Sequence, residues 1–209
     1  MPRKPATYAE RTAQRERIRR AAAEVYDEGG LLGVTARAVS ARAGVSTGLL
    51  YSYFSSLGEV LQSLWVEPVT KANRRLESIA SKHDNPVERI RALLSAYVDF
   101  ALDEPEVFRG ALLFVRPASI PAPDVEPLAS LVFYRLLWAA IDQGQAVGTI
   151  RSGDADRVAQ LAWASVHGAL ALPVNIHRYD VQPQAELAEA MVGHVMASLH
   201  PESADRGGR

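Results

Sequence analysis

The sequence predicts an all-α protein, and three observations lead to this fold class. Apolar residues recur at helical spacing between the glycine and proline breaks of the 209-residue chain. No segment of the chain has the alternating or β-branched pattern of a strand. Two short helical patterns separated by a glycine, within residues 34–61, are typical of a helix-turn-helix. We therefore expect an N-terminal three-helix domain with this motif, followed by a larger C-terminal helical bundle.

The first element is a helix expected over residues 10–28. Its apolar stripe consists of Ile18, Ala22, Val25 and Tyr26. A second face carries three arginines four residues apart, Arg11, Arg15 and Arg19, which are either ordinary solvated surface or a row that follows DNA phosphates. Gly29–Gly30 is expected to end this helix.

The next two elements are the helices of the motif. Thr35 is a candidate N-cap for a helix that ends at Ala43, and Gly44 can supply the positive φ that closes it. Val45 is the apolar anchor of the turn, and Ser46 can cap the following helix. A tight glycine turn between two short helices is the arrangement in which the second helix enters the major groove.

This second helix is expected over residues 47–54. Leu49 and Leu50 are predicted to face the core of the small domain. The positions left near the outer surface are Thr47, Gly48, Tyr51 and Tyr53. Because the major groove is about 12 Å wide and admits one helix, these positions are candidates to meet DNA.

The remaining breaks divide the rest of the chain into six expected helices. They span residues 57–82, 86–102, 104–115, 128–144, 155–171 and 184–199. Pro68 is expected to bend the first of them, whereas Pro86 at the first helical position and Asp154 as an N-cap mark two helix starts. Residues 116–127 contain four prolines and are expected to form a surface loop.

The N-terminal third of the chain resembles the DNA-binding signature of the TetR family of bacterial transcriptional regulators. The similarity is carried by AGVSTGLLYSYF, residues 43–54, together with Tyr26, Gly30, Val34, Thr35, Glu59 and Leu61. The resemblance implies a transcriptional regulator. The residues that it implies in contact with bases or phosphates are Arg37, Ser46, Thr47, Gly48, Tyr51 and Tyr53.

Three positions depart from the family pattern. Ala36 stands where a second hydroxyl is usual, and Ser40–Ala41 replaces a common pair of an apolar residue and alanine. Leu57 stands where the family usually carries a lysine that contacts a phosphate. This departure puts one backbone contact in question, and Ser55 or Ser56 is expected to replace it only in part.

The motif also has two other interpretations. Gly44–Gly48 matches G-x-S-x-G, the nucleophile elbow of α/β-hydrolases, but that motif needs a buried strand before its first glycine. Residues 35–43 are instead rich in Ala and Arg. A helical binding module that does not bind DNA is the second alternative, and the discriminating observation is salt-dependent affinity for a duplex. We expect a protein that is not an enzyme.

Composition and charge limit the classes of function. With no cysteine, the chain has neither a disulfide framework nor a zinc–thiolate site. Residues 1–56 contain nine basic and five acidic residues, whereas the rest contains 14 and 19, so the basic end fits a polyphosphate partner. The longest uncharged stretch, residues 158–176, is too polar for a membrane span, and no apolar signal segment begins the chain. We expect a cytoplasmic protein with no membrane contact.

The resemblance also implies a regulatory domain that holds a small molecule. Trp163, His167 and Gly168 resemble a Trp…His-Gly feature of one branch of the TetR family. The alternatives are a core or interface histidine with one partner, and aromatic residues that simply form core. The candidate pocket residues are Tyr97, Phe100, Phe114, Tyr134, Trp138, Trp163 and His167. The histidines lack metal-ligand spacing and no glycine-rich phosphate loop occurs, so neither a metal nor a cofactor is expected.

The last two helices are expected to form a dimer surface because small residues lie beside a continuous apolar face. The candidate interface residues are Trp163, His167, Gly168, Ala171, Met191, Val192, Val195 and Leu199. A single helix-turn-helix reads only a few base pairs, so we expect a homodimer on a palindromic operator, released by a small-molecule effector. The expected domains are residues 1–56 for DNA binding and 57–200 for regulation and dimerisation, followed by a disordered tail, residues 201–209.

Overall fold

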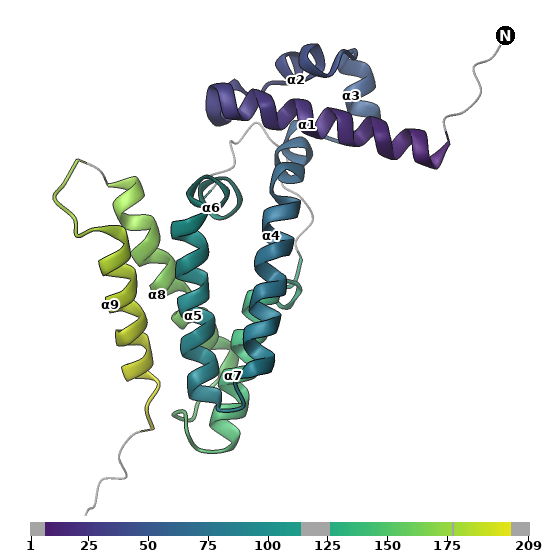
Figure 1. Ribbon diagram of the computed structural model, residues 1–209. Coiled ribbons are helices and arrows are strands. Elements are labelled where there is room, and N and C mark those ends of the chain that lie inside the picture. Colours follow the sequence, from purple (N-terminus) through teal and green to yellow (C-terminus); the bar gives the residue numbers. More distant parts are fainter. Residues whose placement is uncertain (1–6, 114–125, 177, 202–209) are drawn as a thin grey trace, which may run out of the picture. The chain divides into compact units, whose positions relative to one another are not determined.

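The computed structural model describes residues 7–113, 126–176 and 178–201 (Figure 1). Within these ranges every regular element is a helix, which confirms the predicted fold class. None of the described helices is both long and apolar enough to span a membrane. The described residues form two compact units. The first contains the chain up to Val69 and residues 109–113, and the second contains Thr70–Phe108 and the residues from 126 onward.

Four helices build the first unit: α1 (Tyr8–Gly33), α2 (Ala36–Ala43), α3 (Thr47–Tyr53) and the first half of α4 (Leu57–Lys82). Helix α1 starts two residues earlier than the periodicity predicts. Thr7 Oγ1 accepts from the amide of Glu10, and the Glu10 carboxylate accepts from the amide of Thr7, which is a capping box. The predicted break is present at Gly30, which has φ 61° and ψ −164°, but a further turn continues to Gly33.

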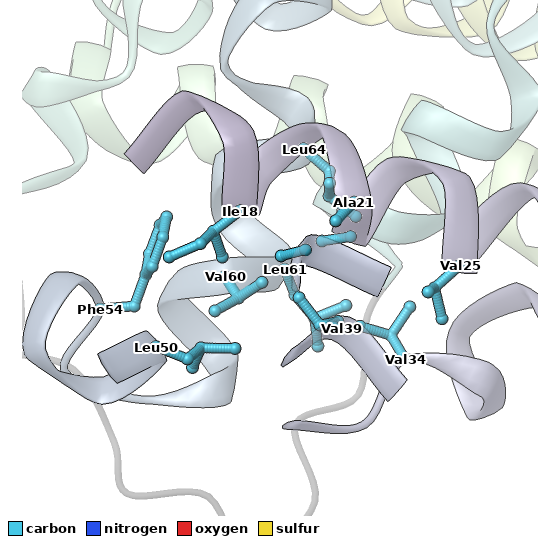
Figure 2. Close-up of a cluster of buried hydrophobic side chains, with 12 residues drawn as sticks. Ile18, Ala21, Val25, Val34, Val39, Leu50, Phe54, Val60, Leu61 and Leu64 are labelled. Carbon is cyan, nitrogen blue, oxygen red and sulfur yellow. The ribbon is translucent and has the colours of Figure 1, made fainter. Parts of the chain in front are cut away.

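The core of the first unit lies where all four helices meet. Figure 2 shows Ile18 of α1, Leu50 of α3 and Val60 of α4 pointing toward one another, with Phe54 closing one end. Val39 of α2 completes this set of fully buried side chains. Because four short segments share one small core, each large side chain carries much of the stability of the unit.

The second unit adds α5 (Pro86–Asp103), the start of α6 (Pro105–Leu112) up to Phe108, a 3-10 turn (Leu128–Ser130), α7 (Val132–Ala146), α8 (Ala155–Asn175) and α9 (Gln184–Ser198). Asn85 and Asp154 cap α5 and α8 through their side-chain oxygens. The helix predicted from residue 128 begins only at Val132, after the 3-10 turn. Helix α8 includes Pro173 near its end, where the missing N–H costs only one hydrogen bond. The predicted loop at residues 116–127 lies mostly outside the described residues.

The helices of this unit pack around α5 and α8. Helix α5 contacts α7, α8 and α9, and α8 lies beside α9 (Figure 1). An ion pair of 2.8 Å between Arg75 Nη2 and Asp99 Oδ2 joins the second half of α4 to α5. Apolar side chains form the buried faces of α5 and α8, among them Leu93 and Leu94 of α5 and Val166 and Leu170 of α8.

Gly144 of α7 is expected to tolerate no side chain. A Cβ at this position would lie 2.4 Å from Cγ1 of Ile150 and 3.3 Å from Cβ of Pro86. Gly144→Ala should therefore lower the free energy of unfolding by about 1–3 kcal/mol through overpacking. The matched control is Gly29→Ala in α1, where a Cβ would meet nothing within 4 Å and the gain in helix propensity should dominate. Urea unfolding of both variants measures this, and an equal effect at the two glycines would contradict the packing.

Candidate nucleic-acid interface and regulatory domain

The turn between α2 and α3 is built by Gly44. Its backbone is left-handed, with φ 62° and ψ 40°. The amide of Gly44 donates to the carbonyl of Ala41 at 3.2 Å, and the amide of Val45 donates to Ser40 at 2.9 Å. This pair of bonds is the Schellman motif, so the predicted glycine corner is confirmed. Because α2 is a helix and not a strand, the nucleophile-elbow interpretation of Gly44–Gly48 fails its structural requirement.

Helix α3 begins directly after this corner. Ser46 is its N-cap, and Oγ accepts from the amide of Leu49 at 3.1 Å, as predicted. Leu50 is fully buried. The prediction that Leu49 also faces the core was wrong, because this side chain is 41% exposed. A helix of two turns offers the core one narrow stripe, and Leu50 with Phe54 fills it (Figure 2).

The residues predicted to meet DNA are mostly exposed. Arg37 on α2 and Ser46, Thr47 and Gly48 at the start of α3 lie at the surface, and Tyr51 is 45% exposed. Tyr53 differs from them, because its ring is partly buried against the core of the first unit. The guanidinium of Arg11 lies 5.6 Å from the centre of that ring.

Arg15 holds the end of α3 in place. Its Nη1 donates to the carbonyl of Tyr53, and its Cζ lies 4.2 Å from the centre of the Phe54 ring. Nη2 lies 2.6 Å from Oε1 of Glu59, whose Oε2 accepts from the amide of Ser55 at 2.6 Å. Burial opposes the charge of Glu59, but these bonds outweigh it and lower the pKa of the carboxyl. Arg15 therefore joins α1, α3 and α4, a role that sequence reasoning missed.

The hydroxyls of the two serines before α4, Ser55 and Ser56, form hydrogen bonds within the protein. Ser55 Oγ donates to Glu59 at 2.9 Å, and Ser56 Oγ accepts from the amide of Glu59 at 3.1 Å as the N-cap of α4. Leu57 packs partly against the core. Ser55 thus donates its hydroxyl proton within the protein, which reduces what it can offer a phosphate, whereas the cap bond of Ser56 does not use that hydroxyl's proton.

The arginines of residues 7–56 divide into two groups. Arg15, Arg19, Arg20 and Arg42 are paired with carboxylates, and Arg42 bridges Glu24 at 3.3 Å and Glu28 at 2.6 Å. In residues 7–56, the arginines without such an ion pair are Arg11, Arg17 and Arg37. Two of the three arginines predicted to form a row on α1, Arg15 and Arg19, therefore form ion pairs within the protein.

An aromatic cluster in the second unit surrounds Tyr97 of α5. The Tyr97 ring stacks on Phe133 at 4.6 Å and meets the edges of Phe108 and Trp163 at 6.1 and 6.4 Å. Its Oη lies 2.7 Å from Nδ1 of His167, a hydrogen bond between the two side chains. Burial raises the pKa of Tyr97 to about 12, although the nearby Trp163 indole acts in the opposite direction. Trp163 Nε1 is buried, and no group among the described residues meets it in hydrogen-bond geometry.

The predicted pocket residues are thus only partly brought together. Tyr134 joins the cluster through its ring, 6.3 Å from Trp163, and its hydroxyl donates to Asp156. Phe100 has no ring contact in the described part of the chain, and Trp138 is largely at the surface. Phe114 lies outside the described residues. Phe108 and Phe133 are members of the cluster that the predicted set omits.

The predicted dimer residues also occupy different environments. Val192, Val195 and Leu199 are buried within the chain's own core, because this face of α9 packs against α5 and α8. Trp163, His167, Ala171 and Met191 are partly buried. Gly168 is exposed, and a Cβ there would meet nothing within 4 Å.

The outward faces of α8 and α9 carry small and apolar residues three or four positions apart. On α8 they are Leu161, Ala164, Gly168 and Leu172, and on α9 they are Ala190, Gly193 and Ala197. We call this set the α8–α9 face. The seven residues of this face are exposed and three or four positions apart, so on each helix they form one small and apolar stripe.

Two family descriptions match the chain. Residues 18–64 match bacterial regulatory proteins of the tetR family, and residues 90–195 match the tetracyclin repressor-like C-terminal domain. The chain belongs to the TetR family. It is therefore a transcriptional regulator of this family, with a DNA-binding helix-turn-helix formed by α2 and α3.

A curated relative and several solved structures agree with this membership. The uncharacterized HTH-type transcriptional regulator YobS of Bacillus subtilis is 32% identical over 96 residues, which are 46% of this chain and 49% of that protein. The chain thus spans about half the length of this relative.

Structures with lower identity share the fold. FadR from Bacillus subtilis in complex with stearoyl-CoA is 20% identical, with a TM-score of 0.63 over 88% of this chain and 99% of that one. RolR in complex with resorcinol is 17% identical, with a TM-score of 0.64 over 95% and 93%. These TM-scores show that the chain shares the fold of both structures.

The stability of this TetR-family regulator is expected to depend on pH through His167. Burial lowers the pKa of His167 below 6.5, so the unfolded chain takes up the proton first as pH falls. The histidine's contribution is complete above pH 6.5 and is lost as pH falls from there toward its lower pKa in the folded protein. Between about pH 7.5 and 5.5, wild type should lose more stability than His167→Gln in urea unfolding. Parallel losses in the two proteins would contradict this assignment.

Proposed function

We propose that this regulator is a cytoplasmic, non-enzymatic repressor that binds a palindromic operator as a homodimer and is released by a small-molecule effector. The observation that carries the proposal is the exposed side of α3, held outward by the Gly44 corner and fixed at its far end by Arg15. The proposed DNA-binding domain is residues 1–56, and the regulatory domain is residues 57–200, followed by a tail at 201–209.

The proposed DNA contacts divide between phosphates and bases. Arg37 is exposed and has no ion pair with a described carboxylate, so it is assigned to a phosphate. Thr47 and Tyr51 are assigned to base edges or phosphates through their hydroxyls. Ser46 and Gly48 are assigned to the close approach of the helix start to DNA. The Ser46 hydroxyl is turned back to the Leu49 amide as the N-cap, and Gly48 has no side chain in the way. Tyr53 has the weakest support, because its ring is partly buried.

Dimerisation through the α8–α9 face follows from the amount of DNA that one helix can read. A single α3 discriminates a few base pairs at about 1–3 kcal/mol each, too little to select one genomic site. Two-fold pairing of the α8–α9 face would bury small residues against small residues in a four-helix arrangement. Four partly buried residues are each the direct chain neighbour of a residue of this face: Trp163, His167, Ala171 and Met191.

The Tyr97 cluster is the proposed effector site. It combines apolar rings with two polar groups that a ligand can meet, Trp163 Nε1 and the side chain of His167. Two structures of the same fold are described as complexes with small organic molecules, stearoyl-CoA and resorcinol. An effector that binds the DNA-free regulator more tightly than the DNA-bound regulator lowers the affinity for the operator. The decrease is at most the ratio of the effector's affinities for these two states.

Selection of duplexes from a random library by the purified full-length chain, followed by sequencing, tests this function. We expect an inverted repeat whose half-sites are centred one DNA turn apart, about 34–36 Å. Transcription in vitro from a promoter that carries the selected repeat should decrease when the protein is added. No enriched repeat, or increased transcription, would contradict the proposed repressor, and affinity for no duplex at any salt concentration would favour the non-DNA helical module.

A further inference from the structure

The exposed side of α3 has an apolar centre. Successive residues of a helix are about 100° apart around its axis, so the positions opposite the buried Leu50 and Phe54 are Gly48, Leu49 and Ser52. All three are exposed. Thr47 and Tyr51 lie to one side of this centre, and the partly buried Tyr53 lies to the other. The most outward part of the helix is therefore not the part that the tyrosines occupy.

Only one of these three positions presents an apolar side chain to a ligand. Gly48 has none, and Ser52 Oγ donates to the carbonyl of Leu49 within the helix at 2.7 Å. Leu49 remains, with its aliphatic end exposed and its amide bonded to Ser46 Oγ. Leu49, between Gly48 and a serine whose hydroxyl donates within the helix, therefore forms a small apolar projection on the helix surface.

The major groove offers an exposed leucine one kind of methyl group as an apolar partner. The base edges there carry hydrogen-bond donors and acceptors, and the one methyl group among them is the C5-methyl of thymine. A leucine that packs on a donor or acceptor removes its water without replacing the hydrogen bond, which is unfavourable. A leucine that packs on a methyl group buries apolar surface on both sides.

We propose that Leu49 is a specificity-determining residue that reads the C5-methyl group of thymine in each half-site. The proposal rests on the proposed role of α3 as the reading helix. Gly48 supports it, because the missing side chain lets this part of the helix approach the base edges closely.

The test replaces each thymine of the selected operator, one at a time, by deoxyuridine, which lacks only the methyl group. Wild type should lose affinity about fourfold at one or two positions of the half-site, the factor expected for one buried methyl-sized group. Leu49→Ala should bind the unmodified operator more weakly and should show no further loss with deoxyuridine at those positions.

Two control variants separate this reading from general effects. Leu32→Ala removes another exposed leucine of the first unit, 94% exposed on α1, and should keep the wild-type sensitivity to deoxyuridine. Ser52→Ala should do the same, because its hydroxyl is bonded within α3. Thermal unfolding of Leu49→Ala should match wild type closely, since the side chain is outside the core.

The outcomes also separate this proposal from the function on which it rests. If the chain selects an operator but deoxyuridine weakens wild type and Leu49→Ala equally at every position, the assignment of Leu49 is wrong while the repressor stands. The same conclusion follows if the half-sites contain no thymine. If the chain selects no operator, the proposed function fails first.

Discussion

Gly168→Arg is expected to convert the proposed homodimer into a monomer. Gly168 lies at the middle of the outward face of α8, where a Cβ meets nothing within 4 Å of the same chain. An arginine there is compatible with the folded protomer, but in the pair it would bring a bulky charge between closely packed helices without a carboxylate partner. Size-exclusion chromatography with light scattering at micromolar concentration measures the change.

The loss of pairing should also remove tight operator binding. The affinity of one dimer for two linked half-sites exceeds its affinity for a single half-site by a factor on the order of 10² to 10⁴. Gly168→Arg should therefore lose this factor while its circular dichroism stays native. Ser78→Arg adds the same charge to an exposed position of α4 and serves as the control that should remain dimeric. A Gly168→Arg protein that is still a dimer would remove the α8–α9 face as the interface.

Phe54→Ala is expected to unfold the DNA-binding region while the second unit stays folded. Phe54 is 1% exposed, packs among Ile18, Leu50 and Val60, and lies beneath the Arg15 guanidinium. Removal of a buried phenyl ring costs about 3–5 kcal/mol, which is a large part of what so small a core can supply. Hydrogen exchange measured by mass spectrometry should show faster exchange in α1 to α3 and unchanged exchange in α7 to α9.

The conservative variant Phe54→Leu keeps most of the apolar volume and is expected to retain protection in α1 to α3. If the alanine variant exchanges as slowly as wild type in these helices, the core does not depend on Phe54. If exchange accelerates equally in α7 to α9, the two units do not unfold separately.

Local signals in the sequence predicted the motif well. Thr35, Gly44 and Ser46 act on neighbours within five residues, so their roles follow from spacing alone. The same reasoning could have found the Thr7–Glu10 capping box, which has the Thr-x-x-Glu spacing. Leu49 shows the limit, because an apolar side chain in a short helix does not reveal whether a core is wide enough to cover it.

Contacts between distant residues could not be predicted from one sequence. Arg15 and Glu59 are 44 positions apart, and Tyr97 and His167 are 70 positions apart. Each stands on a helix face that a periodicity argument treats as charged surface or as generic core. Likewise, the spacing of Val192 and Val195 predicts an apolar face of α9, but only packing shows that α5 and α8 cover it within the same chain.

The most direct test of the account is the affinity for the selected operator of Thr47→Ala, Tyr51→Ala and Arg37→Ala, measured over a range of salt concentrations. The first two should each bind at least about tenfold more weakly. Arg37→Ala should reduce the slope of log affinity against log salt by about 0.9 for each protomer. Leu32→Ala, which removes an exposed side chain of α1 outside α3, should match wild type. Wild-type affinity in all three variants would show that α3 and its surroundings are not the surface that reads DNA.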